Sequence, residues 1–87
     1  MFSILIEEVF QIRNRRGITL IGKASGIISI GDYLFDSDNR NNCYSIIGIE
    51  MVHYSSIEKN LTYNPAIIIE PGDYEPSRLI GKTLEAQ

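Results

Sequence analysis

The chain has 87 residues, of which 44% are hydrophobic and 22% charged, so we expect one globular domain over residues 1–87 rather than a disordered chain. Eight Lys and Arg against eleven Asp and Glu give a net charge of −3, which argues against nucleic-acid binding driven by overall charge. The single cysteine, Cys43, excludes an intrachain disulfide and a cysteine cluster around a metal.

Apolar and polar residues alternate with a period of two along much of the chain, which is typical of β-strands. We expect a long first strand over residues 2–13, with a bulge near Glu7–Val9, where the alternation falters. Further strands are expected, in chain order, over residues 18–24, 33–37, 43–54, 65–70 and 82–86. In the strand over 43–54, the pattern places Ile47, Ile49 and Met51 toward the core and Glu50 toward water.

Short connections separate these strands. Gly and polar residues predict turns near residues 15–17, 38–42 and 71–73 and a loop over 55–64. A short apolar link occupies 27–30, and residues 75–79 could make one helical turn. Six to seven strands without a crossover helix indicate an all-β, antiparallel fold. We expect a small closed β-barrel, because closure removes the exposed strand edges.

The apolar run that opens the sequence, residues 1–6, lacks a basic region before it and is followed at once by Glu7 and Glu8. A signal peptide would need a longer apolar stretch and a small-residue cleavage site. No segment reaches the roughly 20 apolar residues of a membrane-spanning helix. We therefore expect a cytoplasmic protein without membrane contact.

Several short motifs occur in a fixed order along the chain: Ile6-Glu7-Glu8-Val9-Phe10, Arg16-Gly17, Gly22-Lys23, Ile30-Gly31-Asp32, Gly48-Ile49-Glu50-Met51 and Gly81-Lys82-Thr83-Leu84. In this order and spacing the sequence resembles the second domain of elongation factor Tu and related translational GTPases. The resemblance covers essentially the whole chain and implies the same small β-barrel.

In elongation factor Tu this domain follows a GTP-binding domain and helps to hold the aminoacylated end of tRNA. The resemblance implies ligand-binding roles for Glu7, Glu8, Phe10, His53 and Asn64, the last in a loop. His53 stands where the family usually has arginine, and Ile21 where it has threonine. The GTP-binding domain is absent from this chain, so no nucleotide cofactor is expected.

The residues themselves suggest simpler interpretations of the same positions. On a regular strand Glu7 and Glu8 would point to opposite faces, so they could not act together on one substrate without a bulge. We expect one to be solvated and the other to accept hydrogen bonds from backbone N–H groups. A ligand-binding role is the alternative.

The sequence offers no recognisable catalytic or metal centre. His53 is the only histidine, and Cys43 lies ten residues away on the same expected strand, about 33 Å distant. The two side chains therefore cannot form a nucleophile–base pair, and a metal would need several converging ligands. We expect His53 to lie at the surface or at a strand end, and we expect no enzymatic activity, metal or cofactor.

The basic residues cluster around the first hairpin. Arg13, Arg15 and Arg16 lie at its tip, and Lys23 lies on the returning strand. Charged side chains at a turn are commonly just solvated. The alternative is a contact with RNA phosphates or with an acidic partner, because several guanidinium groups suit bidentate recognition.

These observations favour a non-catalytic, stand-alone binding module that docks on a protein or ribonucleoprotein partner. The resemblance implies a link to translation, with tRNA or the ribosome as the partner. The alternative is a protein-interaction or assembly module unrelated to RNA, in its simplest form a homodimer, since a barrel without its neighbouring domain would expose an apolar face. A small enzyme or ligand-binding barrel is a third interpretation, but so small a barrel is normally filled by its own side chains.

Overall fold

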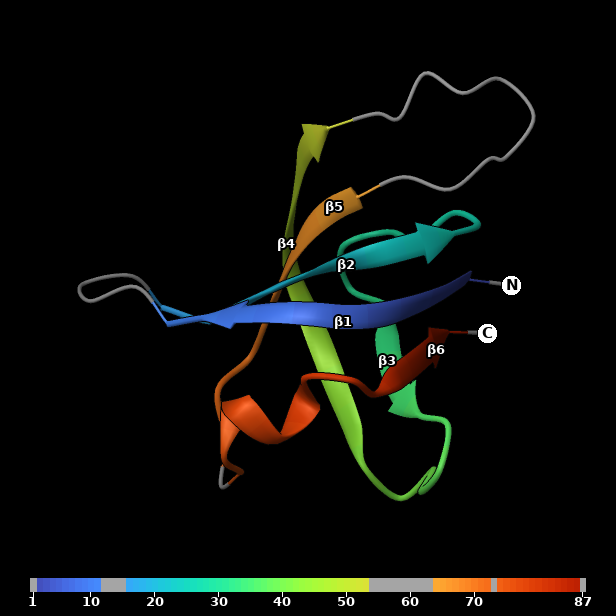
Figure 1. The fold of residues 1–87 in the computed structure, drawn as a ribbon, viewed down its shortest axis with the longest axis vertical. Helices are drawn as coiled ribbons and strands as arrows, with labels where there is room; N and C mark the ends of the chain where they lie inside the picture. The colour runs from blue at the N-terminus through green and yellow to red at the C-terminus, as the bar shows by residue number, and fades with distance from the viewer. Residues whose placement is uncertain (1, 12–15, 54–63, 73, 87) are drawn as a thin grey trace.

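The computed structural model describes residues 2–11, 16–53, 64–72 and 74–86. In these residues the chain forms six strands and one 3-10 helix (Figure 1). Their bounds are β1 Phe2–Phe10, β2 Ile18–Ser25, β3 Tyr33–Asp36, β4 Cys43–His53, β5 Asn64–Ile69, η1 Pro76–Leu79 and β6 Thr83–Ala86. All neighbouring strands are antiparallel, and they close into a barrel in the order β1-β2-β5-β4-β3-β6. The expected all-β closed barrel is confirmed.

The strand bounds follow the alternation in the sequence to within a few residues. The helical turn expected over 75–79 is present as η1. The link over 27–30 forms no strand: Ile28 packs against the core, whereas Ile27 and Ile30 are exposed. Asn64 is the first residue of β5 rather than a loop residue, and the rest of the loop expected over 55–64 lies outside the described residues. The first strand ends at Phe10, and residues 12 and 13 are not described.

The interior of the barrel is filled by aliphatic side chains that alternate along each strand. Large residues with almost no exposed surface include Phe2, Ile4, Ile6, Ile18, Leu20, Leu34, Ile46, Ile67, Ile69 and Leu84. Isoleucine dominates because its branched Cβ packs well against neighbours on a pleated sheet. Leu79 of η1 is also buried, so the short helix is held to the barrel by an apolar contact.

A bulge in β4 changes which of its residues face the core. Ile46 pairs with Ile69 and Gly48 with Ile68, so Ile47 is the extra residue. Consequently Ile46 is buried and Ile47 only half-buried, which contradicts the expectation that Ile47 is a core residue. Beyond the bulge the alternation is restored as expected: Ile49 packs against the core and Glu50 is exposed. The side chain of Met51 lies outside the described part of the structure.

The barrel closes where the first and last strands meet. Phe2 pairs with Ala86, and the pairing continues to Leu5 and Thr83. The two ends of the chain therefore lie side by side (Figure 1). Among the described residues no helix is long and apolar enough to cross a membrane.

Candidate functional site

The second half of β1 is shaped by a bulge, which confirms the irregularity expected near residues 7–9. Ile6 pairs with Gly22 of β2, and Glu8 pairs with Ile21, so Glu7 is the extra residue. The two strands approach so closely there that a Cβ atom on Gly22 would overlap the carbonyl oxygen of Leu5. Glycine is thus required at position 22 by close backbone approach.

The bulge brings two carboxylates to the outside of the barrel. Glu7 and Glu8 are both exposed, and neither has a hydrogen-bond or ion-pair partner among the described residues. One of the two was expected to accept hydrogen bonds from backbone N–H groups, and no backbone N–H of the described residues donates to either. The reason is that a bulge suspends strict alternation, so consecutive residues both reach solvent.

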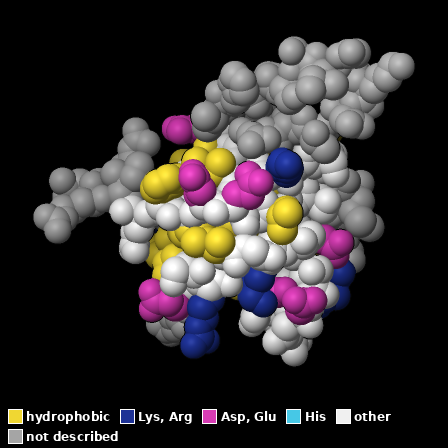
Figure 2. All heavy atoms as spheres, viewed as in Figure 1, with side chains coloured by type: hydrophobic (Ala, Val, Ile, Leu, Met, Phe, Trp, Pro, Cys, Tyr) yellow, Lys and Arg dark blue, Asp and Glu magenta, His cyan; other side chains and the backbone are white. Residues whose placement is uncertain are grey.

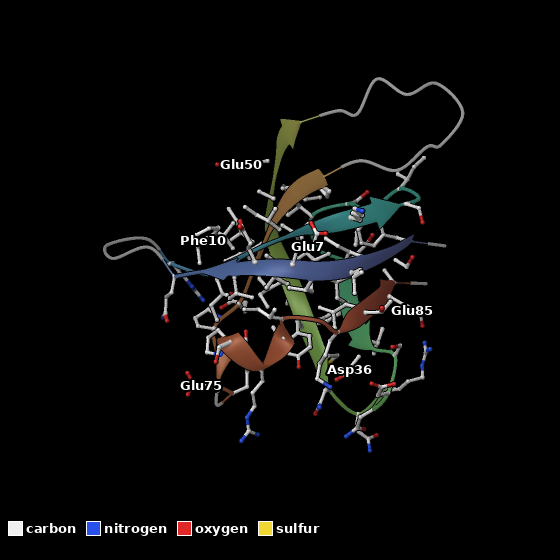
Figure 3. The ribbon with its side chains drawn as sticks, in the orientation of Figure 1. Glu7, Phe10, Asp36, Glu50, Glu75 and Glu85 are labelled. Atoms are coloured by element: carbon white, nitrogen blue, oxygen red, sulfur yellow. The ribbon has the colours of Figure 1, made fainter. Side chains whose placement is uncertain are left out.

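The same bulge reverses the positions of the next two residues. Val9 turns inward and packs against the core, whereas Phe10 turns outward with 47% of its surface exposed. On an uninterrupted strand, Phe10 would share the inner face with Ile4 and Ile6. Figure 3 shows Glu7 and Phe10 on the same side of β1. An exposed aromatic ring thus lies close in sequence and in space to two carboxylates.

The strand register extends this surface across the neighbouring strands. Phe10 pairs with Thr19 of β2, and Thr19 pairs with Ile68 of β5. Two residues further along, Glu8 pairs with Ile21, which pairs with Ala66, and Ala66 pairs with Glu50 of β4. We call the outward-facing group Glu7, Glu8, Phe10, Thr19, Ile21 and Ile68 the Phe10 surface. Figure 2 shows acidic side chains directly beside hydrophobic ones on this side of the molecule.

Ile68, a half-buried residue of β5, adds an apolar side chain to the Phe10 surface. Two glycines flank it: a Cβ on Gly17 would come within 2.5 Å of Ile68 Cγ2, and one on Gly48 within 3.1 Å of Ile68 Cδ1. Gly17 also has a φ of +104°, which side chains rarely adopt. The absence of side chains at both positions lets Ile68 lie against the backbone opposite Thr19, which in turn pairs with Phe10.

The other two residues implied by the resemblance lie on the same four-stranded part of the barrel. His53, the last residue of β4, pairs with Asn64, the first residue of β5. The backbone therefore brings them together, beyond the row that joins Glu8 to Glu50. Their side chains lie outside what the structure describes, as do Arg13 and Arg15.

The two described members of the expected basic group, Arg16 and Lys23, lie apart. The Arg16 Nη2 atom donates to both carboxylate oxygens of Glu70 at 2.9 Å, so its charge is matched. Lys23 is exposed and pairs with Leu5, five residues along β2 from Ile18 and thus about 17 Å away from that strand's start. Lys23 therefore lies farther from Arg16 than their positions in the sequence suggest.

A second polar region, which the sequence did not reveal, lies where β3, β4, η1 and β6 meet. Asp36 is only 2% exposed, and its carboxylate lies 3.2 Å from the Lys82 Nζ atom and accepts a hydrogen bond from the Asp38 N–H. Burial raises the pKa of Asp36, but the Asp38 N–H and Lys82 outweigh burial, so the pKa lies below its ordinary value. Lys82 is 46 positions away in the chain, and only the β3–β6 pairing brings it to Asp36.

Two tyrosines line the same region. The Tyr44 and Tyr74 rings meet edge to face at 5.1 Å, and the Tyr74 hydroxyl donates to the Glu70 carbonyl at 2.6 Å. Burial, with the neighbouring Tyr44 and Glu70, raises the pKa of Tyr74 to about 12. A cavity of about 340 Å³ opens here, lined by Asp36, Asn42, Tyr44, Tyr74, Glu75, Arg78, Leu79 and Lys82. The carboxylates of Asp36 and Glu75 balance the charges of Arg78 and Lys82 in this lining. The cavity therefore favours neither an anion nor a cation.

Within the described residues, no three His, Cys, Asp or Glu side chains are placed to hold a metal ion. No family model matches the chain, and comparison with curated proteins and with solved structures finds no match. The resemblance to elongation factor Tu therefore rests on the motifs alone.

Proposed function

We propose that this chain is a non-catalytic binding module that docks on a macromolecular partner through the Phe10 surface. The observation that supports the proposal most is the half-exposed Phe10 ring beside two exposed carboxylates. A large aromatic side chain left in water at the end of a strand gains from burial in an interface. The surface is built on paired strands, so it is preorganised and needs little ordering on binding.

The resemblance to translational GTPases makes a protein or ribonucleoprotein of the translation apparatus the first partner to look for. Affinity capture of the tagged protein from its native cell extract, with protein and RNA identified together, tests this. The proposal expects a retained partner that is lost with Phe10→Ala and kept with Ile27→Ala, since Ile27 is 91% exposed at a different site. Equal retention by both variants would contradict it.

The RNA version of the proposal has its own test. If RNA contributes, the triple variant Arg13→Ala, Arg15→Ala and Arg16→Ala should weaken RNA retention and reduce its dependence on salt, because each lost phosphate contact lowers the number of released counterions. Unchanged RNA retention across salt concentrations would remove the RNA version and leave the docking module.

A second candidate function, assembly with another copy of the chain, is favoured by a different observation. Ile27, Ile30 and Tyr33 are all more than half exposed within one short stretch before and at the start of β3. Clustered exposed apolar side chains mark interfaces more often than isolated ones do. Light scattering at high concentration should then show a dimer that Ile30→Asp converts to a monomer; a strict monomer would exclude this candidate.

A further inference from the structure

Resting on the proposed function, we infer that the Phe10 surface takes an extended basic segment of a partner protein, with an arginine packed on Phe10 and paired to Glu7 or Glu8. Three features of the described residues support this inference: the charge of the surface, the aromatic ring of Phe10 and the apolar side chains beside it.

The charge of the surface selects a cation. The side chains of Glu7 and Glu8 are exposed and have no partner in the part of the chain that the structure describes. The nearby Arg16 does not offset them, because its guanidinium is held by both oxygens of Glu70. A phosphate backbone would be repelled by these carboxylates, whereas a Lys or Arg side chain would be attracted.

The ring of Phe10 selects arginine among the cations. A guanidinium can stack on an aromatic face and, at the same time, pair with a carboxylate through two N–H groups. Phe10 and Glu8 are two residues apart on β1, so one long side chain can reach both. Lysine carries a single compact charge and cannot satisfy both contacts with the same geometry.

The apolar part of the surface selects a protein segment with a hydrophobic residue next to the basic one. Thr19, Ile21 and Ile68 are half-buried and continue from Phe10 across β2 and β5. Gly17 and Gly48 themselves place no side chain against Ile68, although the Ile47 side chain lies beside it. An extended chain can lie across the strands and place an aliphatic side chain against Ile21 and Ile68.

Site-specific photo-crosslinking tests the inference. Thr19, directly opposite Phe10, is replaced by a benzoylphenylalanine, and the full-length protein is irradiated in its native cell extract. The inference expects crosslinks to protein segments that carry an arginine within about four residues of the crosslinked position, because one extended residue spans about 3.4 Å. The crosslink yield should fall about fivefold with Glu7→Gln plus Glu8→Gln, and also between about 50 mM and about 500 mM salt.

A matched control changes the net charge equally at another site. Glu75→Gln plus Asp38→Asn replaces two exposed carboxylates on other connections and should leave the yield unchanged. Crosslinks to RNA, crosslinked segments without basic residues, or equal yields from the two double variants would each overturn the inference. If affinity capture shows a Phe10-dependent partner while any of these results is obtained, only the inference fails; if capture shows none, the proposed function fails with it.

Discussion

Asp36 and the pair Glu7 and Glu8 differ in both burial and bonding partners. Asp36 is buried and fully partnered, with Lys82 on one oxygen and the Asp38 N–H on the other. Glu7 and Glu8 lie exposed on β1, without partners among the described residues. The first arrangement contributes to folding, because a buried carboxylate left alone would be costly. The second contributes little to folding, so it is the one available for binding.

The two regions also differ in how the chain builds them. Asp36 depends on a contact between β3 and β6, strands that are distant in sequence. Glu7 and Glu8 depend on a local irregularity, the bulge opposite Gly22. Substitutions at each site should therefore separate stability from binding.

The largest effect is expected from Gly22→Ala. Its Cβ would overlap the backbone of Leu5, so the bulge that exposes Glu7 and Glu8 could not form without moving a strand. We expect a loss of at least about 3 kcal/mol in the free energy of unfolding, measured by urea denaturation. Gly31→Ala is the control: Gly31 has a φ of +100°, but an added Cβ would meet no atom within 4 Å, so the change should cost only about 1 kcal/mol. Equal losses would show that close approach is unimportant at position 22.

Asp36→Asn should cost about 2 kcal/mol in the free energy of unfolding, because Lys82 loses its partner and a charge-assisted hydrogen bond is weakened. Since the folded-state pKa of Asp36 is lowered, its contribution is present above about pH 4 and is lost as the pH falls below that value. The variant should therefore lose less stability than the wild type between pH 5 and pH 3 in parallel urea titrations. Exposed Asp38→Asn should change stability by under about 0.5 kcal/mol.

Tyr74→Phe should cost about 1 kcal/mol, because it removes the hydrogen bond to the Glu70 carbonyl while keeping the ring against Tyr44. The pKa of Tyr74 is raised to about 12, so its contribution is complete below about pH 10 and declines between about pH 10 and pH 12. Chemical denaturation across that interval should show a smaller decline in the variant. A parallel decline in both proteins would mean that Tyr74 is not the titrating group.

The smallest effect on stability is expected from Glu7→Gln plus Glu8→Gln. Both side chains are exposed, so the free energy of unfolding should change by less than about 0.5 kcal/mol. The same variant should lose binding to the partner. Asp36→Asn should show the opposite behaviour, with lower stability and unchanged binding. A large loss of stability would instead assign these carboxylates a structural role.

The alternation of apolar and polar residues predicted every strand of the barrel, because burial on one face of a strand is a local property of the sequence. Among the described residues it predicted the wrong face for Ile47, which is half-buried because it is the extra residue of the bulge between Ile46 and Gly48. The bulge at Glu7 likewise leaves Phe10 exposed, whereas an uninterrupted strand would turn it inward. The sequence indicated the first bulge through its irregular pattern but could not place its extra residue.

The candidate site was predictable only in part. Glu7, Glu8 and Phe10 were singled out by a resemblance and lie together, although the bulge rather than regular alternation explains how. The Asp36–Lys82 pair was invisible because nothing in the local sequence links β3 to β6. The distance between Arg16 and Lys23 was likewise not predicted. The two residues are close in sequence, but Lys23 lies well along the extended strand β2.

The pairing of Phe2 with Ala86 has a mechanical consequence. Because β1 and β6 are antiparallel and meet at the two ends of the barrel's chain, tension applied through those ends loads the outermost residue pair first. The hydrogen bonds between β1 and β6 would then break one after another, starting at the Phe2–Ala86 pair. They would not bear the force together, as they would if the strands were pulled in shear.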